Sequence, residues 1–321
     1  MRALVTGGTG FVGSHLVEAL VRRGDTITAL VRSPARAELL KSLGVSLIQG
    51  DLHDTAALQS AAQSVDVVYH VAGLTAATDE PGFLRANRDG TANLIAACAG
   101  GPTRFVLVSS MAAGGPSTPG RPLIGDEPAS PVTAYGRSKL AGETAVRASA
   151  LAWTIIRPPM VYGPRDTEVL KVFKLARTGI VPLFGDGSQL LSAVSGPDLA
   201  TALVAAGTSA ASIGRTYYAC HDETFTSGEF VTRVAASLGK RIRTVHLPLG
   251  LARLALGITG AAARITGKAT ILTADKANEF FQPAWTGSPA PLLRDTGWSA
   301  AQSLTEGLTA TALWYREHGW I

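Results

Sequence analysis

Tyr135 and Lys139 are the two side chains in this 321-residue chain whose types and spacing are best suited to catalysis. They lie four residues apart in the run SPVTAYGRSKLAGE, so on a helix both project from the same face. A tyrosine ordinarily loses its proton at about pH 10, and a neighbouring ammonium lowers that pKa because it stabilises the phenolate. Such a tyrosine can exchange a proton with a carbonyl or an alcohol. The spacing also occurs by chance on solvated helices. Whether the pair is catalytic therefore depends on the predicted elements that would position it.

A glycine-rich turn follows the first predicted strand and opens the first predicted helix. Residues 2–5 are an apolar strand, and from Phe11 and Val12 onward apolar residues recur with helical spacing. Gly7 permits the tight turn, Gly10 lets backbone amides approach a pyrophosphate, and Gly13 allows the helix to pack closely on the sheet. The positive end of the helix dipole then favours the phosphates. The turn predicts a dinucleotide site, although its spacing is G-x-x-G-x-x-G and not G-x-G-x-x-G.

The second predicted strand, residues 26–31, is followed by Arg32 at the position where an NAD site usually carries an acidic residue. A guanidinium suits a 2′-phosphate, and Arg36 is close enough in sequence to add a second charge. We therefore expect NADP(H) to be favoured, with NAD(H) still possible because an arginine here can also stack on adenine. The following strand ends extend the predicted cofactor site, with Asp51 and Leu52 beside the adenine and Val71, Ala72 and Gly73 where small residues let a flat ring lie close.

The composition, 46% hydrophobic and 17% charged, is that of a globular protein with a large core. There is no N-terminal signal core and no apolar run of the roughly 18 to 20 residues that cross a bilayer, so we expect a soluble, cytoplasmic protein. Cys98 and Cys220 lack metal-ligand spacing to a histidine pair, and no metal site is predicted. The net charge of +5 is scattered, without the clustered basic face that nucleic-acid binding requires.

Several motifs occur in an order that is typical of one family. From TGGTGFVG through GDL, HVAG, NRDGTANL, RFVLVSSMAA and YGRSK to RPPMVYGP, the chain resembles the extended short-chain dehydrogenases/reductases. The resemblance implies an α/β fold, with a Rossmann-type doubly wound parallel sheet and a smaller, mostly helical C-terminal substrate part. It also implies roles for the catalytic residues. Ser110 would hydrogen-bond the substrate oxygen, Tyr135 would give or take its proton, and Lys139 would hold the nicotinamide ribose.

The same resemblance implies supporting residues around that set. Asn87 would support the active site through water, and the choice of Ser110 over Ser109 for the substrate oxygen rests on counting along the predicted strand from Phe105. The further expected contacts are Ser109, Pro158 and Val161 with the cofactor and Thr75, Met111, Met160 and Tyr162 with the substrate.

The chain changes character after residue 164. Residues 1–164 are predicted to bind the dinucleotide, with residues 193–222 returning to that part, and residues 165–192 and 223–321 are predicted to bind the substrate. Within the latter, the apolar stretch at 247–271 carries basic residues on one side of a helical pattern. It could line an apolar pocket, rest on a membrane surface or be an ordinary amphipathic helix.

These features predict an oxidoreductase that interconverts a carbonyl and a secondary alcohol on a moderately apolar small molecule, similar to dihydroflavonol reductases and 3β-hydroxysteroid dehydrogenases. Two alternatives stay open. A nucleotide-sugar epimerase or dehydratase with tightly bound cofactor is disfavoured because residues 189–191 hold no arginine for a diphosphate, and a non-catalytic dinucleotide-binding protein is disfavoured because Tyr135 and Lys139 are both present. Relatives often pair through the helices that flank the tyrosine, so a homodimer is expected.

Overall fold

The computed structural model describes residues 1–101, 104–248 and 275–321, together with residues 250, 253, 257 and 259. The apolar stretch at 247–271 therefore lies almost entirely outside the described residues. Within the part of the chain that is described, no helix is both long enough and apolar enough to cross a membrane.

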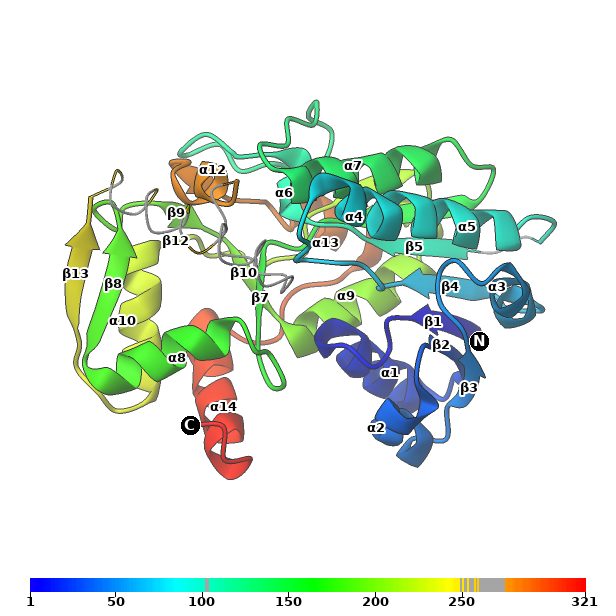
Figure 1. The fold of residues 1–321 in the computed structure, drawn as a ribbon, viewed down its shortest axis with the longest axis horizontal. Helices are drawn as coiled ribbons and strands as arrows, with labels where there is room; N and C mark the ends of the chain where they lie inside the picture. The colour runs from blue at the N-terminus through cyan, green and yellow to red at the C-terminus, as the bar shows by residue number, and fades with distance from the viewer. Residues whose placement is uncertain (102–103, 249, 251–252, 254–256, 258, 260–274) are drawn as a thin grey trace.

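A parallel sheet of seven strands forms the centre of the larger part of the molecule (Figure 1). Its strands follow the order β11, β6, β5, β4, β1, β2, β3, and every neighbouring pair is parallel. The order reverses between β1 and β4, the point at which such sheets bind ligands beyond the carboxyl ends of their strands. The strands are β1 (Arg2–Thr6), β2 (Thr26–Val31), β3 (Ser46–Gln49), β4 (Val67–His70), β5 (Arg104–Val108), β6 (Ala152–Ile156) and β11 (Arg215–Tyr217).

Helices cover both faces of this sheet, which explains why a strand such as β4 is apolar and buried along its whole length. On one face lie α1 (Phe11–Arg23) and α9 (Gly196–Thr208), with α2 (Glu38–Ser42) beside α1. On the other face lie α3 (Thr55–Ala62), α5 (Gly90–Ala97) and α7 (Ala134–Arg147). The predicted Rossmann-type α/β fold is confirmed. Two elements from late in the chain join this part, since α9 packs on α1 and β11 pairs with β6.

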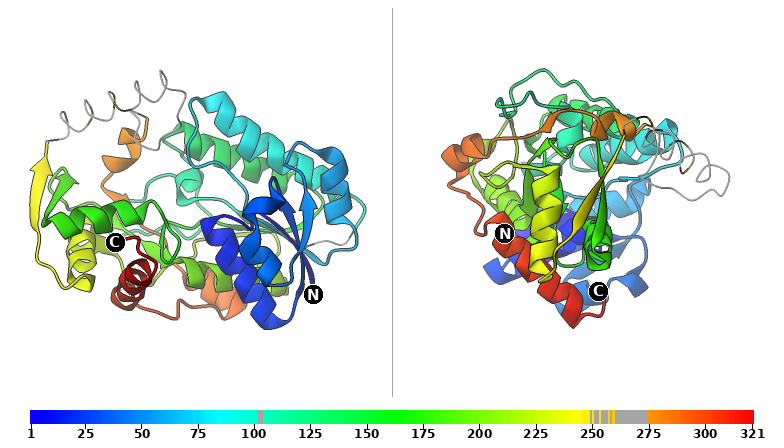
Figure 2. Two further views of the ribbon diagram at one scale, coloured as in Figure 1. Left: turned by 60° about the horizontal axis from the view of Figure 1, so that its bottom comes forward. Right: turned by 90° about the vertical axis from the view of Figure 1, so that its left-hand side faces the viewer.

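A second hydrophobic core lies in the C-terminal part, beside the sheet and not over it (Figures 1 and 2). It is built by α8 (Val169–Thr178), α10 (Ser227–Ser237) and α14 (Leu304–Glu317), with Phe173, Phe230 and Tyr315 among its buried residues. The parallel pair β8 (Ile180–Phe184) and β13 (Arg243–Leu247) lies at its edge.

The remaining elements are short. They are α4 (Glu80–Leu84), α6 (Met111–Gly114), α12 (Ala277–Phe280), α13 (Ala290–Thr296), β7 (Met160–Tyr162), β9 (Leu190–Leu191), β10 (Ala193–Ser195), β12 (Phe225–Thr226) and β14 (Ala284–Trp285). One turn of π-helix, Arg85–Asp89, joins α4 to α5, and single 3₁₀ turns occur at Pro34–Arg36 and Ala210–Ser212.

Candidate active site

Tyr135 and Lys139 lie in the first two turns of α7, directly after its N-cap residue Thr133. The Thr133 hydroxyl accepts a hydrogen bond of 3.1 Å from the Gly136 amide, which fixes where the helix begins. Lys139 is buried, and its Nζ donates to the Val108 carbonyl at the carboxyl end of β5, at 2.7 Å. Tyr135 is half-buried. The two predicted residues therefore meet the sheet at the ends of its central strands.

The pKa values of the pair differ from the sequence-based expectation. Burial raises the pKa of Tyr135 to about 12, although a hydrogen bond with the Ser110 side chain acts in the opposite direction. Burial lowers the pKa of Lys139 to about 8, with the Glu143 charge opposing that change. The expected lowering of the tyrosine pKa by Lys139 is thus wrong for the protein alone, because desolvation outweighs it and the Lys139 ammonium is bound to a carbonyl. At neutral pH Tyr135 carries its proton.

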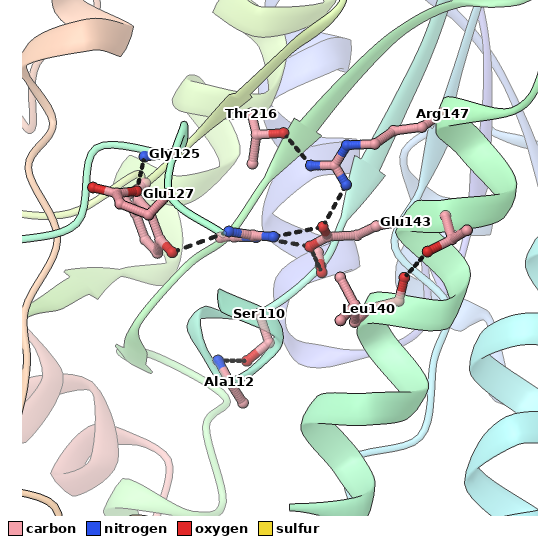
Figure 3. A network of polar contacts seen from close by, with 12 residues as sticks. Ser110, Ala112, Gly125, Glu127, Leu140, Glu143, Arg147 and Thr216 are labelled. Atoms are coloured by element: carbon pink, nitrogen blue, oxygen red, sulfur yellow. Dashed lines mark hydrogen bonds and ion pairs between the residues drawn. The ribbon is translucent and has the colours of Figure 1, made fainter. Parts of the chain in front are cut away.

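The two serines after β5 have different surroundings. Ser109 is buried and donates to Glu143 Oε1 at 2.6 Å. Ser110 N-caps α6, accepting a bond of 3.2 Å from the Ala112 amide (Figure 3), and its side chain is near enough to Tyr135 to lower the pKa of the phenol against the effect of burial. The structure brings Ser110, and not Ser109, to the tyrosine.

Asn87 lies in the π-helical turn between α4 and α5 and is buried. Its side-chain amide exchanges two hydrogen bonds with the backbone of Leu74, at 2.8 and 3.0 Å. It also donates to the Ser138 hydroxyl at 2.9 Å, and that hydroxyl in turn donates to the Tyr135 carbonyl at 2.7 Å. Asn87 therefore ties the loop after β4 to the helix that carries the tyrosine. An irregular helical turn of this kind is often found at functional sites.

The loop after β4 runs directly past these groups. A Cβ atom on Gly73 would lie 2.9 Å from Asn87 Oδ1 and 3.3 Å from Lys139 Nζ, so only a glycine lets the backbone pass there. The Val71 amide donates to the Thr6 carbonyl, and Ala72 contacts the first glycine turn. The predicted residues Val71, Ala72 and Gly73 thus lie between that turn and the catalytic set.

The glycine turn has the shape that a dinucleotide needs. Gly7 has a φ of 74°, and a Cβ there would lie 2.7 Å from the Ala72 amide nitrogen. A Cβ on Gly13 would lie 2.1 Å from the Gly7 carbonyl, so α1 can approach the turn only without a side chain. Gly10 caps α1 without any side-chain acceptor, and the first turn, with Phe11 and Val12, holds no acidic residue. The helix N-terminus is left free for an anion, so these residues fit the pyrophosphate of a dinucleotide.

A cavity of about 140 Å³ adjoins this turn, and its lining includes Gly10, Phe11, Arg36 and Arg165. Arg36 is exposed and forms no ion pair with any described residue, whereas Arg32 is exposed and does not line the cavity. Arg165 has a φ of 72°, unusual for a residue with a side chain, and holds both carboxylate oxygens of Glu18, at 2.6 and 2.8 Å. That pairing lowers the pKa of Glu18 to about 2. Arg36 is therefore the cation of this cavity whose charge is not already neutralised.

Other predicted site residues are spread more widely. Asp51 and Leu52 follow β3, where the Asp51 carboxylate accepts from the His53 amide and the Leu52 carbonyl accepts from Asn93. The expected nicotinamide contacts lie beyond β6, with Pro158 buried and Val161 in β7. Of the expected substrate residues, Thr75 is exposed in the loop after β4, Met160 is half-buried in β7, Met111 is buried in α6, and Tyr162 is fully buried with its hydroxyl 2.9 Å from His221 Nε2.

His70 is fully buried at the end of β4. Its ring nitrogens pair with the hydroxyls of Thr6, at 2.7 Å, and Thr91, at 2.9 Å. Burial lowers the pKa of His70 to about 3, so the ring stays neutral.

A buried ion pair beneath the site escaped the sequence analysis. Glu143, one turn after Lys139 on α7, binds Arg157 at 2.7 and 2.8 Å, and both side chains are almost completely buried. Glu143 also accepts from Arg147, which bonds to Thr216 of β11 (Figure 3). The cluster joins α7 to β6 and β11. Nothing in the sequence indicated that Glu143, in a helix with several polar residues, meets Arg157, which follows an apolar strand.

Comparisons with known proteins agree with this geometry. A family model described as the NAD dependent epimerase/dehydratase family matches residues 3–220. The chain is 34% identical to a ceramide reductase of Caulobacter vibrioides, over 99% of this chain and 95% of the relative. It is 32% identical to a 2-alkyl-3-oxoalkanoate reductase of Stenotrophomonas maltophilia, over 96% of this chain and 97% of the relative.

Among solved structures, gox2253 superposes with a TM-score of 0.82 at 25% identity, covering 99% of this chain and 98% of that one. The UDP-glucuronic acid 4-epimerase of Bacillus cereus, solved with UDP-glucuronic acid and NAD, superposes with a TM-score of 0.79 at 21% identity, covering 99% and 100%. The second likeness is one of fold. With the glycine turn, the doubly wound sheet and these matches together, the chain belongs to the NAD dependent epimerase/dehydratase family and is an oxidoreductase of the extended short-chain dehydrogenase/reductase type.

Proposed function

We propose that this protein is an NADP(H)-preferring ketoreductase that acts on a 3-oxo compound with an alkyl chain. The observation that carries the proposal is the arrangement of Ser110, Tyr135 and Lys139 at the carboxyl ends of the central strands, beside the backbone of Gly73. The names of two relatives with near-complete coverage support the substrate class, since one is named for a lipid and the other for an alkyl-substituted 3-oxo acid.

The protein's own residues would bind and protonate the substrate oxygen. Ser110 and Tyr135, whose side chains lie close together, would both donate to that oxygen and stabilise the negative charge that develops on it. When bound, the nicotinamide supplies the hydride to the carbonyl carbon. Tyr135 then gives its proton to the oxygen, and its raised pKa of about 12 keeps that proton in place at neutral pH. The protonation state of Tyr135 thus suits reduction of a ketone.

The side chain of Gln189 argues against a nucleotide sugar. Its amide nitrogen donates to the carbonyls of Glu279, Phe280 and Gln282, at 3.2, 3.1 and 2.7 Å. By the resemblance stated above, sugar-nucleotide enzymes place a diphosphate-binding arginine in this stretch. A neutral amide that is already engaged by three carbonyls would leave a buried diphosphate poorly compensated.

The preference for NADP(H) rests on Arg36. It lines the cavity beside the glycine turn, it is exposed, and no described residue pairs with its charge. A guanidinium in that position suits a 2′-phosphate, whereas NADH offers it only the pyrophosphate that both cofactors share. Arg32, exposed at the end of β2, would be the second positive charge nearby.

The proposal is tested by following NADPH and NADH oxidation with a 2-alkyl-3-oxoalkanoate, a 3-oxo ceramide and UDP-glucose. We expect NADPH-dependent reduction of one or both 3-oxo compounds, with a product 2 Da heavier by mass spectrometry. Conversion of the nucleotide sugar without net cofactor consumption, and no reduction of either ketone, would instead identify an epimerase or dehydratase. We also propose a homodimer through the helices that flank Tyr135. Sedimentation velocity measures its mass, and a monomer at micromolar concentration contradicts it.

A further inference from the structure

A short segment of the C-terminal part packs against the turn of α7 that carries Tyr135 (Figure 1). The Asp275 carboxylate accepts a hydrogen bond of 2.8 Å from the Ala134 amide. Glu279, on α12, accepts a hydrogen bond of 2.7 Å from the hydroxyl of the N-cap residue Thr133. Two carboxylates at a helix N-terminus are favoured by its dipole. Residues about 140 positions later in the chain therefore fix the start of the catalytic helix.

The same segment places a cation over the catalytic tyrosine. Lys276 Nζ lies 5.8 Å from the centroid of the Tyr135 ring, within the range of a cation–π contact. Its ammonium forms an ion pair with the Glu279 carboxylate, and 26% of the Lys276 side chain is exposed. The ammonium of Lys139, by contrast, is bound to the Val108 carbonyl. The contact between a positive charge and the tyrosine ring is thus made from the substrate part of the chain.

Glu279 holds this lysine from a fixed position. Its carboxylate is bonded to Thr133 and Lys276, and only about a tenth of the side chain is exposed. Its backbone carbonyl accepts from the indole of Trp285 at 2.8 Å and from the Gln189 amide at 3.2 Å. An anion anchored in this way cannot move far from Tyr135 when a substrate binds.

We propose that Lys276 and Glu279 are positioning residues that set the proton affinity of Tyr135 from the substrate side. The cation over the ring stabilises the phenolate, and the anion behind it opposes the phenolate and keeps the lysine in place. The inference rests on the proposed function in taking Tyr135 as the proton donor. Among the residues that the structure describes, the charged groups near the tyrosine are Lys139 and Arg137 on α7, Glu80 on α4, and Asp275, Lys276 and Glu279 in this segment.

Two substitutions that should shift the pKa of Tyr135 in opposite directions test the roles of Lys276 and Glu279. Lys276→Met removes the cation and should raise the pKa of Tyr135, whereas Glu279→Gln removes the anion, keeps an acceptor for Thr133 and should lower it. Each shift should be on the order of 0.5 to 1 pH unit for one charge about 6 Å away in a partly exposed site. A purely structural role would not move the two variants in opposite directions.

The direct measurement is NMR of the NADP⁺-bound protein with ¹³C at Cζ of its six tyrosines. The Tyr135 signal is assigned by its absence from the Tyr135→Phe protein and followed from pH 7 to 11. We expect the phenolate fraction at high pH to be greatest in Glu279→Gln, intermediate in the wild type and least in Lys276→Met, with Lys276→Arg restoring the wild-type value. Equal fractions, or displacement of both variants in one direction, overturn the proposal.

A matched control pair joins α7 to α4, with Arg137 two residues after Tyr135 on α7 and Glu80 on α4. Arg137 and Glu80 form an exposed ion pair at 2.8 Å, so Arg137→Met and Glu80→Gln should leave the Tyr135 titration unchanged. Alcohol oxidation, which requires the phenolate, should be three- to tenfold slower in Lys276→Met and faster by a similar factor in Glu279→Gln. If no ketone or alcohol is turned over, the proposed function fails, while the order of the NMR signals still decides the role of the pair.

Discussion

Substitution of Glu143 by glutamine should strongly destabilise the fold, because Glu143 is the only partner of the buried Arg157 guanidinium with a full negative charge among the described residues. Arg157 is 2% exposed and Glu143 is fully buried. Breaking such a pair from one side leaves an uncompensated buried charge, which destabilises by about 3 to 5 kcal/mol. For a chain of this size we expect the melting temperature to fall by on the order of 10 °C.

The assay is urea-induced unfolding followed by circular dichroism, with thermal unfolding as a second measurement. Glu80→Gln is the control, because it breaks an exposed ion pair between Glu80 of α4 and Arg137 of α7 and should change the free energy of unfolding by less than about 1 kcal/mol. If the two variants lose equal stability, the account of the buried pair is wrong.

The stability that the Glu143 carboxylate contributes should change with pH in a defined direction. The Arg157 pairing lowers the pKa of Glu143 despite its burial, so the carboxylate stabilises the fold fully above its ordinary pKa of 4.5. That stabilisation is lost as the pH falls through the lower pKa of the folded state. The wild type should therefore lose stability in acid while Glu143→Gln, which has no proton to take up there, loses less. The difference in the free energy of unfolding between the wild type and Glu143→Gln should narrow below about pH 4.

Three further substitutions probe the catalytic set and the cofactor site. Tyr135→Phe should reduce ketone turnover at least a thousandfold, roughly the contribution of a general acid together with a lost oxyanion donor, while NADPH binding by fluorescence stays unchanged. Gly13→Ala should abolish NADPH binding in isothermal titration, because its Cβ would lie 2.1 Å from the Gly7 carbonyl; near-normal affinity would show that the turn is not the phosphate site. Arg36→Ser should weaken NADPH about 10- to 100-fold and leave NADH unchanged, the loss expected for one charge-assisted contact. A larger loss of NADPH affinity from Arg32→Ser would instead assign the 2′-phosphate site to the end of β2.

The sequence predicted the elements of the fold well because each depends on residues that are close together along the chain. The Gly7 to Gly13 turn, the continuous apolar strands and the spacing of Tyr135 and Lys139 each have a physical reason within a few residues. The sequence could not show which arginine reaches the cavity beside the glycine turn. A 3₁₀ turn at Pro34–Arg36 brings Arg36 to its lining and leaves Arg32 outside it.

The sequence did not reveal contacts between segments that lie far apart along the chain. The Glu143 and Arg157 pair joins α7 to the residue after β6, and the Lys276 and Tyr135 contact spans more than a hundred residues. The pKa of Tyr135 was expected to be low because spacing reveals a neighbouring charge but not desolvation. In the folded chain, burial is the largest influence on that pKa.

These long-range contacts give the C-terminal part a role at the start of α7 in addition to the substrate binding that we propose for it. Asp275 and Glu279 bind the first turn of α7, and Gln189 binds the carbonyls around α12, so the walls expected to surround the substrate are linked to the proton donor. A substrate that displaces Lys276 from Glu279 would change the charge beside Tyr135 as it binds. A substrate with an anionic group near its ketone would do this most strongly, because it offers the lysine an alternative partner. Comparing the pH dependence of turnover for a 3-oxo acid and its neutral amide measures that coupling, and identical profiles would limit Lys276 to a fixed electrostatic role.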